Sequence, residues 1–229
     1  MKKSFSHILF DLDGTLIDHF EAIHEAYNFA QNTLGLPPAS LEKVKATVGG
    51  SVPVTMRRLI GDDASDETYE KALELFDQRF SEVMLEKVSI LPGVRDLLEA
   101  LTSQGVPVSV FTNKKGEHAR AVLEHIDLAR YFQAIVGAGD TAFRKPEPEF
   151  TDHVLETVGS EAAETLMIGD SPFDVEGGKV RGLWVAVVAT GSHTSEQLQE
   201  TPADWVFTDM AALGRELFGE EMAAGPSSP

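Results

Sequence analysis

The chain has 229 residues, with 19 lysines and arginines against 37 aspartates and glutamates, so its formal net charge is −18. This length accommodates one large domain or a core with a smaller module, and a hydrophobic fraction of 42% can bury a core, which excludes disorder of the whole chain. The acidic balance argues against a nucleic-acid or anionic-membrane partner, and the lack of cysteine excludes disulfides, thiolate catalysis and cysteine-based metal sites.

The first predicted strand is the short apolar run His7–Phe10, which stops at the turn-forming cluster Asp11-Leu12-Asp13-Gly14-Thr15. The residues before it lack the hydrophobic segment of a signal peptide. No run in the chain approaches the ~18 consecutive apolar residues of a membrane span. We therefore expect a cytoplasmic protein with no membrane partner.

Residues 18–87 have the apolar spacing of helices throughout. The predicted helices are His19–Thr33, Ser40–Val48, Val54–Ile60 and Asp66–Glu86. The last of them carries an apolar stripe, interpreted as core, which consists of Tyr69, Leu73, Phe76 and Phe80. The segment is thus expected to be all-helical.

After residue 93, predicted strands alternate with predicted helices. The strands are Val106–Phe111, Ala134–Val136, Thr165–Ile168, Trp184–Val188 and Trp205–Phe207, and the helices are Val94–Ser103, Glu117–His125, Pro148–Val158, Phe173–Arg181 and Met210–Leu217. Continuously apolar strands between helices predict an α/β fold, with a parallel sheet covered by helices on both faces.

The order of these elements predicts how the chain divides. Residues 1–17 and 88–218 would form the α/β core, and the helical segment 18–87 would be an all-α domain inserted after the first strand. Such an insertion lies at the carboxyl edge of the sheet, where open α/β folds bind ligands, so it is placed to act as a lid. The small and polar residues 219–229 are expected to be a disordered tail.

Polar residues follow several predicted strands at the point where each strand ends. Asp11 and Asp13 follow the first strand, Thr112-Asn113-Lys114 the second, and Asp170 a later one, with Asp174 one helical turn further on. Lys145 lies in the segment after the third strand, between Arg144 and Pro146. Because parallel strands direct their carboxyl ends to one side, three acidic positions, a threonine and a lysine should converge on one crevice.

This combination of side chains suits one kind of chemistry. Crowded carboxylates repel each other unless a cation balances them, and an all-oxygen ligand set is typical of Mg²⁺. One aspartate can then act as nucleophile while its neighbour transfers protons. A hydroxyl and a lysine remain to stabilise an oxyanion, which favours phosphoryl transfer.

The four elements Asp11-Leu12-Asp13-Gly14-Thr15, Thr112, Lys145 and Gly169-Asp170 with Asp174 resemble, in order and context, the four motifs of the haloacid-dehalogenase-like (HAD) superfamily. The resemblance covers residues 6–218 and implies a Rossmann-like sheet with a C1-type helical cap. Phe111-Thr112-Asn113-Lys114 and Arg144-Lys145-Pro146-Glu147-Pro148 look most like the phosphoglycolate phosphatase-like branch.

The resemblance also implies a role for each matching residue. Asp11 would be the nucleophile that forms an aspartyl-phosphate, and Asp13 would protonate the leaving group and then activate water. Thr112 and the Asn113 backbone N–H would hold phosphoryl oxygens, and Lys145 would neutralise charge. Mg²⁺ would bind an Asp11 carboxylate oxygen, the Asp13 main-chain carbonyl and the Asp170 carboxylate, with Asp174 orienting Lys145 or a metal-bound water.

The resemblance leaves several functions open. The dehalogenases of the superfamily lack the second aspartate, so Asp13 favours phosphate esters. The expected activity is Mg²⁺-dependent hydrolysis of a small phosphorylated metabolite, with phosphoglycolate leading and pyrophosphate, a sugar phosphate or a nucleotide monophosphate open. A β-phosphoglucomutase-like phosphosugar isomerase is disfavoured, because the matching cap loop lacks arginine. A non-catalytic binding protein of this fold is the third alternative.

Candidate substrate contacts in the cap are less specific. Gly49 and Gly50 form either a loop that reaches the substrate or a plain turn between helices. Arg57 could contact a substrate anion, although a solvated helix face is the simpler interpretation for Arg57 or its neighbour Arg58. His19 and His24 follow the first strand closely and could face the crevice, but histidines on a helix surface are the simpler interpretation. A monomer and a homodimer are both compatible with the sequence.

Overall fold

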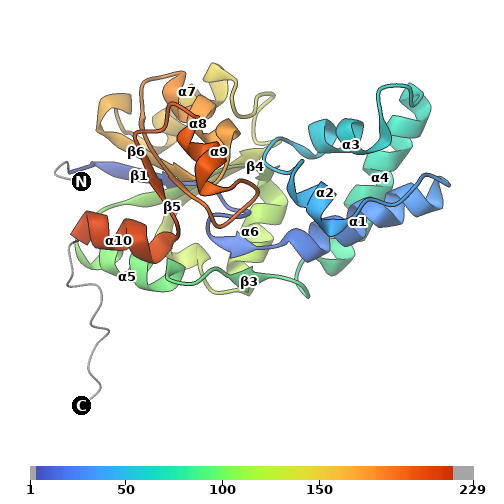
Figure 1. Cartoon of the computed structure of the whole chain (residues 1–229). Helices are drawn as coiled ribbons and strands as arrows, with labels where there is room; N and C mark the ends of the chain where they lie inside the picture. The colour runs from blue at the N-terminus through green and yellow to red at the C-terminus, as the bar shows by residue number, and fades with distance from the viewer. Residues whose placement is uncertain (1–3, 219–229) are drawn as a thin grey trace, which may run out of the picture.

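The computed structural model describes residues 4–218, and a parallel six-stranded sheet forms its centre (Figure 1). The strands of this sheet are β1 (His7–Phe10), β4 (Val108–Lys115), β5 (Phe132–Ala138), β6 (Thr165–Gly169), β7 (Trp184–Val188) and β8 (Trp205–Phe207). They are arranged in the order β5-β4-β1-β6-β7-β8, and each pairs in parallel with its neighbours. The predicted α/β fold is therefore confirmed, and β1 lies between β4 and β6.

Helices cover both faces of this sheet. They are α5 (Val94–Ser103), α6 (Gly116–His125), α7 (Pro148–Val158), α8 (Pro172–Lys179), α9 (Ser195–Gln199) and α10 (Met210–Phe218). Alternate residues of β1 point to opposite faces, so Leu9 packs with Phe150 of α7, whereas Ile8 packs in the cluster that contains Leu97 of α5 and Met210 of α10. A strand that is apolar along its whole length is thus buried on two sides.

Four further helices form a group to one side of the sheet (Figure 1). These helices are α1 (Phe20–Thr33), α2 (Leu41–Lys45), α3 (Val52–Ile60) and α4 (Asp66–Val83), and we call them the helical insertion. Its centre is aromatic: the rings of Tyr27 and Phe76 are 4.4 Å apart, and Phe76 stacks on Phe80 at 5.5 Å. The predicted stripe on α4 therefore faces α1, with Phe76 and Phe80 buried.

Two short strands connect the helical insertion to the sheet. β2 (Ile17–Asp18) leads into it and β3 (Ser89–Ile90) leads out, and the two pair antiparallel with Ile17 opposite Ile90. Both connections therefore run side by side, so the helical insertion is attached to the core through a two-stranded hinge.

The element boundaries differ from the prediction in a few places. The second strand of the core extends to Lys115 instead of ending at Phe111, because Thr112 and Lys115 still pair with β5. The hinge strands and α9 were not predicted, and α2 is shorter than the predicted helix over Ser40–Val48. The predicted tail, residues 219–229, lies outside the described residues. Within residues 4–218, no helix has the length and hydropathy that crossing a membrane requires.

Candidate active site

The predicted site residues lie at the carboxyl ends of three neighbouring strands. Asp11 and Asp13 follow β1, Thr112–Lys114 form the last part of β4, and Asp170 follows β6, with Asp174 in the first turn of α8. Because β1 pairs with both β4 and β6, these three ends are adjacent. Strand order alone thus gathers residues that are up to about 160 positions apart in the chain.

Lys145 connects these strand ends through its buried ammonium group. Its Nζ donates to Asp11 Oδ1 at 2.8 Å, to Asp174 Oδ1 at 2.6 Å and to the Phe111 carbonyl oxygen at 2.7 Å. Burial alone would lower the pKa of Lys145, but the two carboxylates outweigh burial and raise it. Lys145 is therefore a positive charge held between two carboxylates.

Asn113 positions Lys145 through the backbone. Its Oδ1 accepts a hydrogen bond from the Lys145 N–H at 2.8 Å, and its Nδ2 donates to the Lys145 carbonyl at 3.0 Å. The same Nδ2 lies 3.3 Å from the Gly49 carbonyl of the helical insertion. The Asn113 side chain thus supports the site, in addition to the backbone role that was predicted for this residue.

Three carboxylates form a compact cluster next to Lys145. One oxygen from each of Asp11, Asp170 and Asp174 lies within 4.8 Å of the others, and all three residues are buried. Burial and the neighbouring carboxylates raise the pKa of Asp11 to about 6, although Lys145 opposes this shift, and burial also raises the pKa of Asp170 well above its ordinary value.

Asp170 has only neutral partners in the described part of the chain. It accepts hydrogen bonds from the Ser192 N–H at 2.9 Å, the Ser192 hydroxyl at 3.1 Å and the Thr15 hydroxyl at 3.3 Å. An ionised Asp170 would therefore be buried with no basic hydrogen-bond partner among the described residues, which is unfavourable unless a cation binds. The oxygen donors of this cluster fit a divalent metal ion.

Asp174 is held rigidly against the end of β6. Its Oδ2 accepts hydrogen bonds from the Asp170 N–H at 3.2 Å, the Ser171 N–H at 3.0 Å and the Ser171 hydroxyl at 2.7 Å. A Cβ atom on Gly169 would lie 2.2 Å from Asp174 Cγ, so only glycine leaves space for this carboxylate. The pair Gly169 and Asp174 therefore acts as one packing unit that orients Lys145.

Asp13 faces a different set of partners. Its carboxylate accepts two hydrogen bonds from Lys114 Nζ, at 2.8 and 3.0 Å, and His19 Nδ1 lies 3.5 Å from Asp13 Oδ1. Burial would raise the pKa of Asp13, but Lys114 and His19 outweigh it and hold the pKa well below its usual range. Asp13 is therefore an ionised carboxylate in this structure.

Two residues at this site, His19 and Lys114, were assigned no role from the sequence. His19 was interpreted as a surface histidine, which is wrong: it is fully buried, and its Nε2 donates to the Met84 carbonyl at 2.8 Å. No local pattern indicates this contact. Lys114 was placed at the end of the second predicted strand, but its burial beside Asp13 occurs where the pairing of β4 with β5 shifts in register, which strand alternation does not predict. The Thr112 hydroxyl accepts a hydrogen bond from the Lys114 N–H at 3.2 Å.

The candidate contacts from the helical insertion lie in two different places. Gly49 approaches the site: a Cβ atom on it would lie 3.1 Å from the Ser171 Cβ, and one on Gly50 would lie 3.2 Å from Phe173. Arg57 instead bonds within the insertion, with the Ala64 carbonyl at 3.2 Å and the Tyr69 ring at 3.9 Å. The glycine loop thus reaches the segment that follows β6, next to Asp170, whereas Arg57 lines a separate surface pocket.

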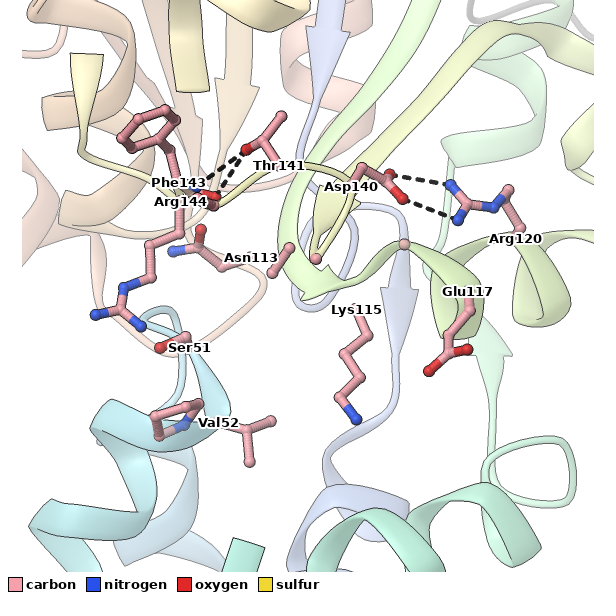
Figure 2. Close-up of a pocket in the computed structure, with 15 residues that line it drawn as sticks. Ser51, Val52, Asn113, Lys115, Glu117, Arg120, Asp140, Thr141, Phe143 and Arg144 are labelled. Carbon is pink, nitrogen blue, oxygen red and sulfur yellow. Dashed lines mark hydrogen bonds and ion pairs between the residues drawn. The ribbon is translucent and has the colours of Figure 1, made fainter. Parts of the chain in front are cut away.

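Two cavities lie between the helical insertion and the core. A small one of about 50 Å³ is bordered by Asp13, Lys114 and aromatic residues of the insertion. A larger one of about 520 Å³ lies between the start of α3 and the loop after β5, with Asn113 in its wall. Figure 2 shows Arg120 paired with Asp140 at one side of the larger cavity, while Lys115 points toward the insertion.

A sheet of this topology, with paired aspartates after its first strand and a lysine among carboxylates, defines a hydrolase of the phosphatase class. Residues 8–188 match the model of the haloacid dehalogenase-like hydrolase family, so the chain belongs to this family.

Relatives support the same assignment. The chain is 35% identical over 232 residues to a phosphoglycolate phosphatase from Rhodospirillum rubrum, with 96% of each chain covered. It is 32% identical over 211 residues to a phosphoglycolate phosphatase from Pseudomonas syringae pv. syringae, covering 90% of this chain and 77% of the relative. The crystal structure of a predicted phosphoglycolate phosphatase from Haemophilus somnus has the same fold, with a TM-score of 0.85 at 24% identity over 95% of this chain and 100% of that one.

Proposed function

We propose that the protein is a Mg²⁺-dependent phosphomonoester hydrolase that acts on a small phosphorylated metabolite through an aspartyl-phosphate on Asp11. The observation that carries this proposal is the position of Lys145 Nζ between Asp11 and Asp174, beside the buried Asp170. The carboxylate proposed as nucleophile is thus hydrogen-bonded directly to the ammonium group whose positive charge would help bind a phosphoryl group.

Asp11 is the nucleophile in this proposal. Its Oδ1 is hydrogen-bonded to Lys145, which leaves Oδ2 free to attack phosphorus. Lys145, the Thr112 hydroxyl and the Asn113 backbone N–H would bind the phosphoryl oxygens, in keeping with reactions in which the protein mainly positions the group and neutralises its charge. Attack forms an acyl phosphate on Asp11 and releases the leaving-group oxygen.

Asp13 would transfer the protons. A proton from Asp13 goes to the leaving oxygen in the first step, and the resulting carboxylate then takes a proton from the water that hydrolyses the acyl phosphate. Lys114 and His19 hold the pKa of Asp13 low, which favours the carboxylate form required by the second step. Substrate binding must therefore weaken the ion pair with Lys114 before the first step.

The metal ion would be held by Asp11, the Asp13 main-chain carbonyl and Asp170. When bound, Mg²⁺ supplies the positive charge that keeps Asp11 ionised and neutralises the phosphoryl group. Asp174 would orient Lys145 or a metal-bound water, as its three hydrogen bonds to the Asp170–Ser171 segment favour.

Residues 18–87 would act as a cap on a core formed by residues 1–17 and 88–218. The hinge of β2 and β3, and the approach of the Gly49 loop to Ser171, support a cap whose closure excludes water from the site. The absence of a nucleic-acid partner, a cytoplasmic location and a monomeric or homodimeric state stay predictions from the sequence.

Phosphoglycolate is the proposed substrate, on the basis of the relatives named phosphoglycolate phosphatase. The second candidate function, a β-phosphoglucomutase-like isomerase, is less well supported, because the Gly49 loop lacks an arginine and Arg57 is bonded within the helical insertion. Conversion of a sugar phosphate to its isomer, in place of phosphate release, would favour this alternative.

Phosphate release from a panel of phosphomonoesters, measured with and without Mg²⁺, tests the hydrolase proposal directly. We expect turnover that requires the metal and is lost in Asp11→Asn and in Asp13→Asn. Full turnover by Asp11→Asn would contradict the assigned nucleophile. Binding of phosphomonoesters without release of phosphate from any of them would instead identify a non-catalytic protein of this fold.

A further inference from the structure

The small cavity beside Asp13 limits the size of the leaving group. The leaving oxygen must lie within hydrogen-bonding distance of the Asp13 carboxylate, which borders a cavity of about 50 Å³. Tyr27, Phe76 and Phe80 of the helical insertion form its aromatic wall, and Thr55 adds a hydroxyl-bearing side chain. This volume accommodates a few water-sized groups, so the space directly beside Asp13 suits a small leaving group better than a sugar or nucleoside with the insertion in this position.

Contacts between the helical insertion and the core define this position. The ammonium of Lys114 lies 4.6 Å from the centre of the Phe80 ring, and His118 Nε2 lies 3.4 Å from the Ser81 hydroxyl. Lys115 forms an ion pair with Asp77 of α4. The cavity is therefore bounded on one side by direct contacts of α4 with β4 and α6, and its size depends on these contacts.

Lys114 brings an unusual charge into this apolar cavity. Only 9% of the residue is exposed, and its ammonium donates to both oxygens of Asp13. An ammonium has three N–H donors, and these hydrogen bonds account for two of them in the described part of the chain. Lys114 can therefore donate to an additional anionic oxygen while it keeps one of its hydrogen bonds to Asp13, which weakens the ion pair as the first proton transfer requires.

The other basic residues of the cavity wall are less suited to bind a ligand. The charge of Lys115 is paired with Asp77, and its side chain is 43% exposed, so solvent screens it. Burial and the nearby Lys114 both lower the pKa of His118, which favours its neutral form. Lys114 is thus the buried positive charge in the wall of this cavity, beside Asp13.

We propose that Lys114 determines substrate specificity by binding a carboxylate on a leaving group of two or three carbon atoms. The inference rests on the proposed phosphatase function and narrows its substrate class to short phosphorylated hydroxy acids. A carboxylate attached to the carbon that bears the leaving oxygen would reach Lys114 while that oxygen stays beside Asp13. Charge-assisted hydrogen bonds of this kind are stronger than neutral ones, so a neutral analogue should bind less well.

A selectivity ratio tests this assignment. The kcat/KM for phosphoglycolate is divided by that for phosphoglycolamide, in which a neutral amide replaces the carboxylate. We expect a ratio of about 100 for the unmodified protein, since loss of a buried charged hydrogen bond commonly reduces kcat/KM by this order. In Lys114→Met the ratio should fall to about 3 or less. Loss of the Lys114–Asp13 ion pair should change kcat/KM by the same factor for both substrates, so this effect cancels in the ratio.

Lys115→Met is the matched control, because it removes the neighbouring lysine whose charge is paired with Asp77. It should keep the ratio of the unmodified protein. Lys114→Gln serves as a second neutral variant if Lys114→Met does not fold, and both are checked by circular dichroism. An unchanged ratio in the Lys114 variants, or an equal loss in Lys115→Met, would overturn the assignment.

Acetyl phosphate separates this inference from the proposed function. If the unmodified protein hydrolyses acetyl phosphate with Mg²⁺ but does not prefer phosphoglycolate over its amide, the specificity assignment is wrong and the phosphatase function stands. If it releases phosphate from none of these three compounds and from no member of the phosphomonoester panel, the proposed function itself fails.

Discussion

Lys145 is a buried ammonium whose three hydrogen bonds join segments that lie far apart in the chain. Its donors go to Asp11, Asp174 and the Phe111 carbonyl, so all three N–H groups have acceptors. Removal of one member of such a buried network is costly, because it leaves the charge of its partners buried and uncompensated. The same residue therefore serves both the stability of the site and its proposed chemistry.

Replacement of Lys145 by methionine should destabilise the metal-free protein and abolish turnover. Two buried carboxylates would lose their counterion, so we expect the free energy of unfolding to fall by about 3–5 kcal/mol. Urea denaturation measures this change. Lys179→Met is the control, since its partly exposed ion pair with Asp204 should contribute less than about 1 kcal/mol. Equal losses in the two variants would contradict the role assigned to Lys145.

At the scale of secondary-structure elements, three consecutive residues at the end of β4 each contribute a different contact to the site. Thr112 and Lys114 are buried at the site, and Asn113 between them clamps Lys145 and contacts Gly49. The strand continues to pair with β5 as far as Lys115, with a shift in register between Thr112 and Lys115. A segment that stays paired to its neighbouring strand holds such side chains more accurately than an unpaired loop would.

The hinge is the other element that bears on catalysis. His19 precedes α1 and Met84 follows α4, so the hydrogen bond between them joins the entry to the helical insertion with its exit. His19 also lies beside Asp13 and packs on Phe80, with ring centres 5.2 Å apart. The position of the insertion is thereby linked to the position of the proposed acid and base.

His19→Phe tests this link. The ring would still pack on Phe80, but both nitrogens would be lost, so Asp13 would be held less accurately. We expect kcat to fall by about tenfold with KM changed less than about twofold, because the loss affects the reacting group more than binding. His24→Phe on the same helix removes a hydrogen bond to the Ala39 carbonyl, 2.9 Å away and remote from Asp13. Its kcat should stay within about twofold, and an equal fall in both variants would argue against a positioning role.

At the scale of the whole molecule, the net charge of −18 separates into two parts. The carboxylates of Asp11, Asp170 and Asp174 are buried together beside Lys145, and Asp13 is paired with Lys114. Other acidic residues lie on the surface, where pairs such as Asp152 with Arg181 are open to solvent. The negative net charge therefore comes largely from solvated surface carboxylates, whereas the buried carboxylate cluster is the part that would favour binding of a cation.

A divalent cation should stabilise the folded protein by linkage. Mg²⁺ at about 100 times its Kd would add about 2.7 kcal/mol, which corresponds to a rise in Tm of roughly 5–10 °C for a chain of this size. Differential scanning calorimetry with Mg²⁺ and with EDTA measures this shift. Asp170→Asn should lose most of it, and the surface variant Asp152→Asn should keep it. A full shift in Asp170→Asn would exclude this residue as a ligand.

The sequence by itself determined the α/β class, the parallel sheet and the strand ends that carry Asp11, Thr112 and Asp170. These features are predictable because periodicity and turn residues are local, and because parallel strands place their carboxyl ends on one side. The hinge strands were missed, since two residues carry too little pattern to identify a strand.

Only the tertiary structure decided what Lys114 and His19 contact and how small the cavity beside Asp13 is. These contacts form between the helical insertion and the core. They depend on the combined packing of many α4 side chains, each interacting weakly, against β4 and α6. No spacing along the chain encodes that packing. The motif predicts where the phosphoryl group binds, and in our proposal the packing of the insertion determines which leaving group fits beside it.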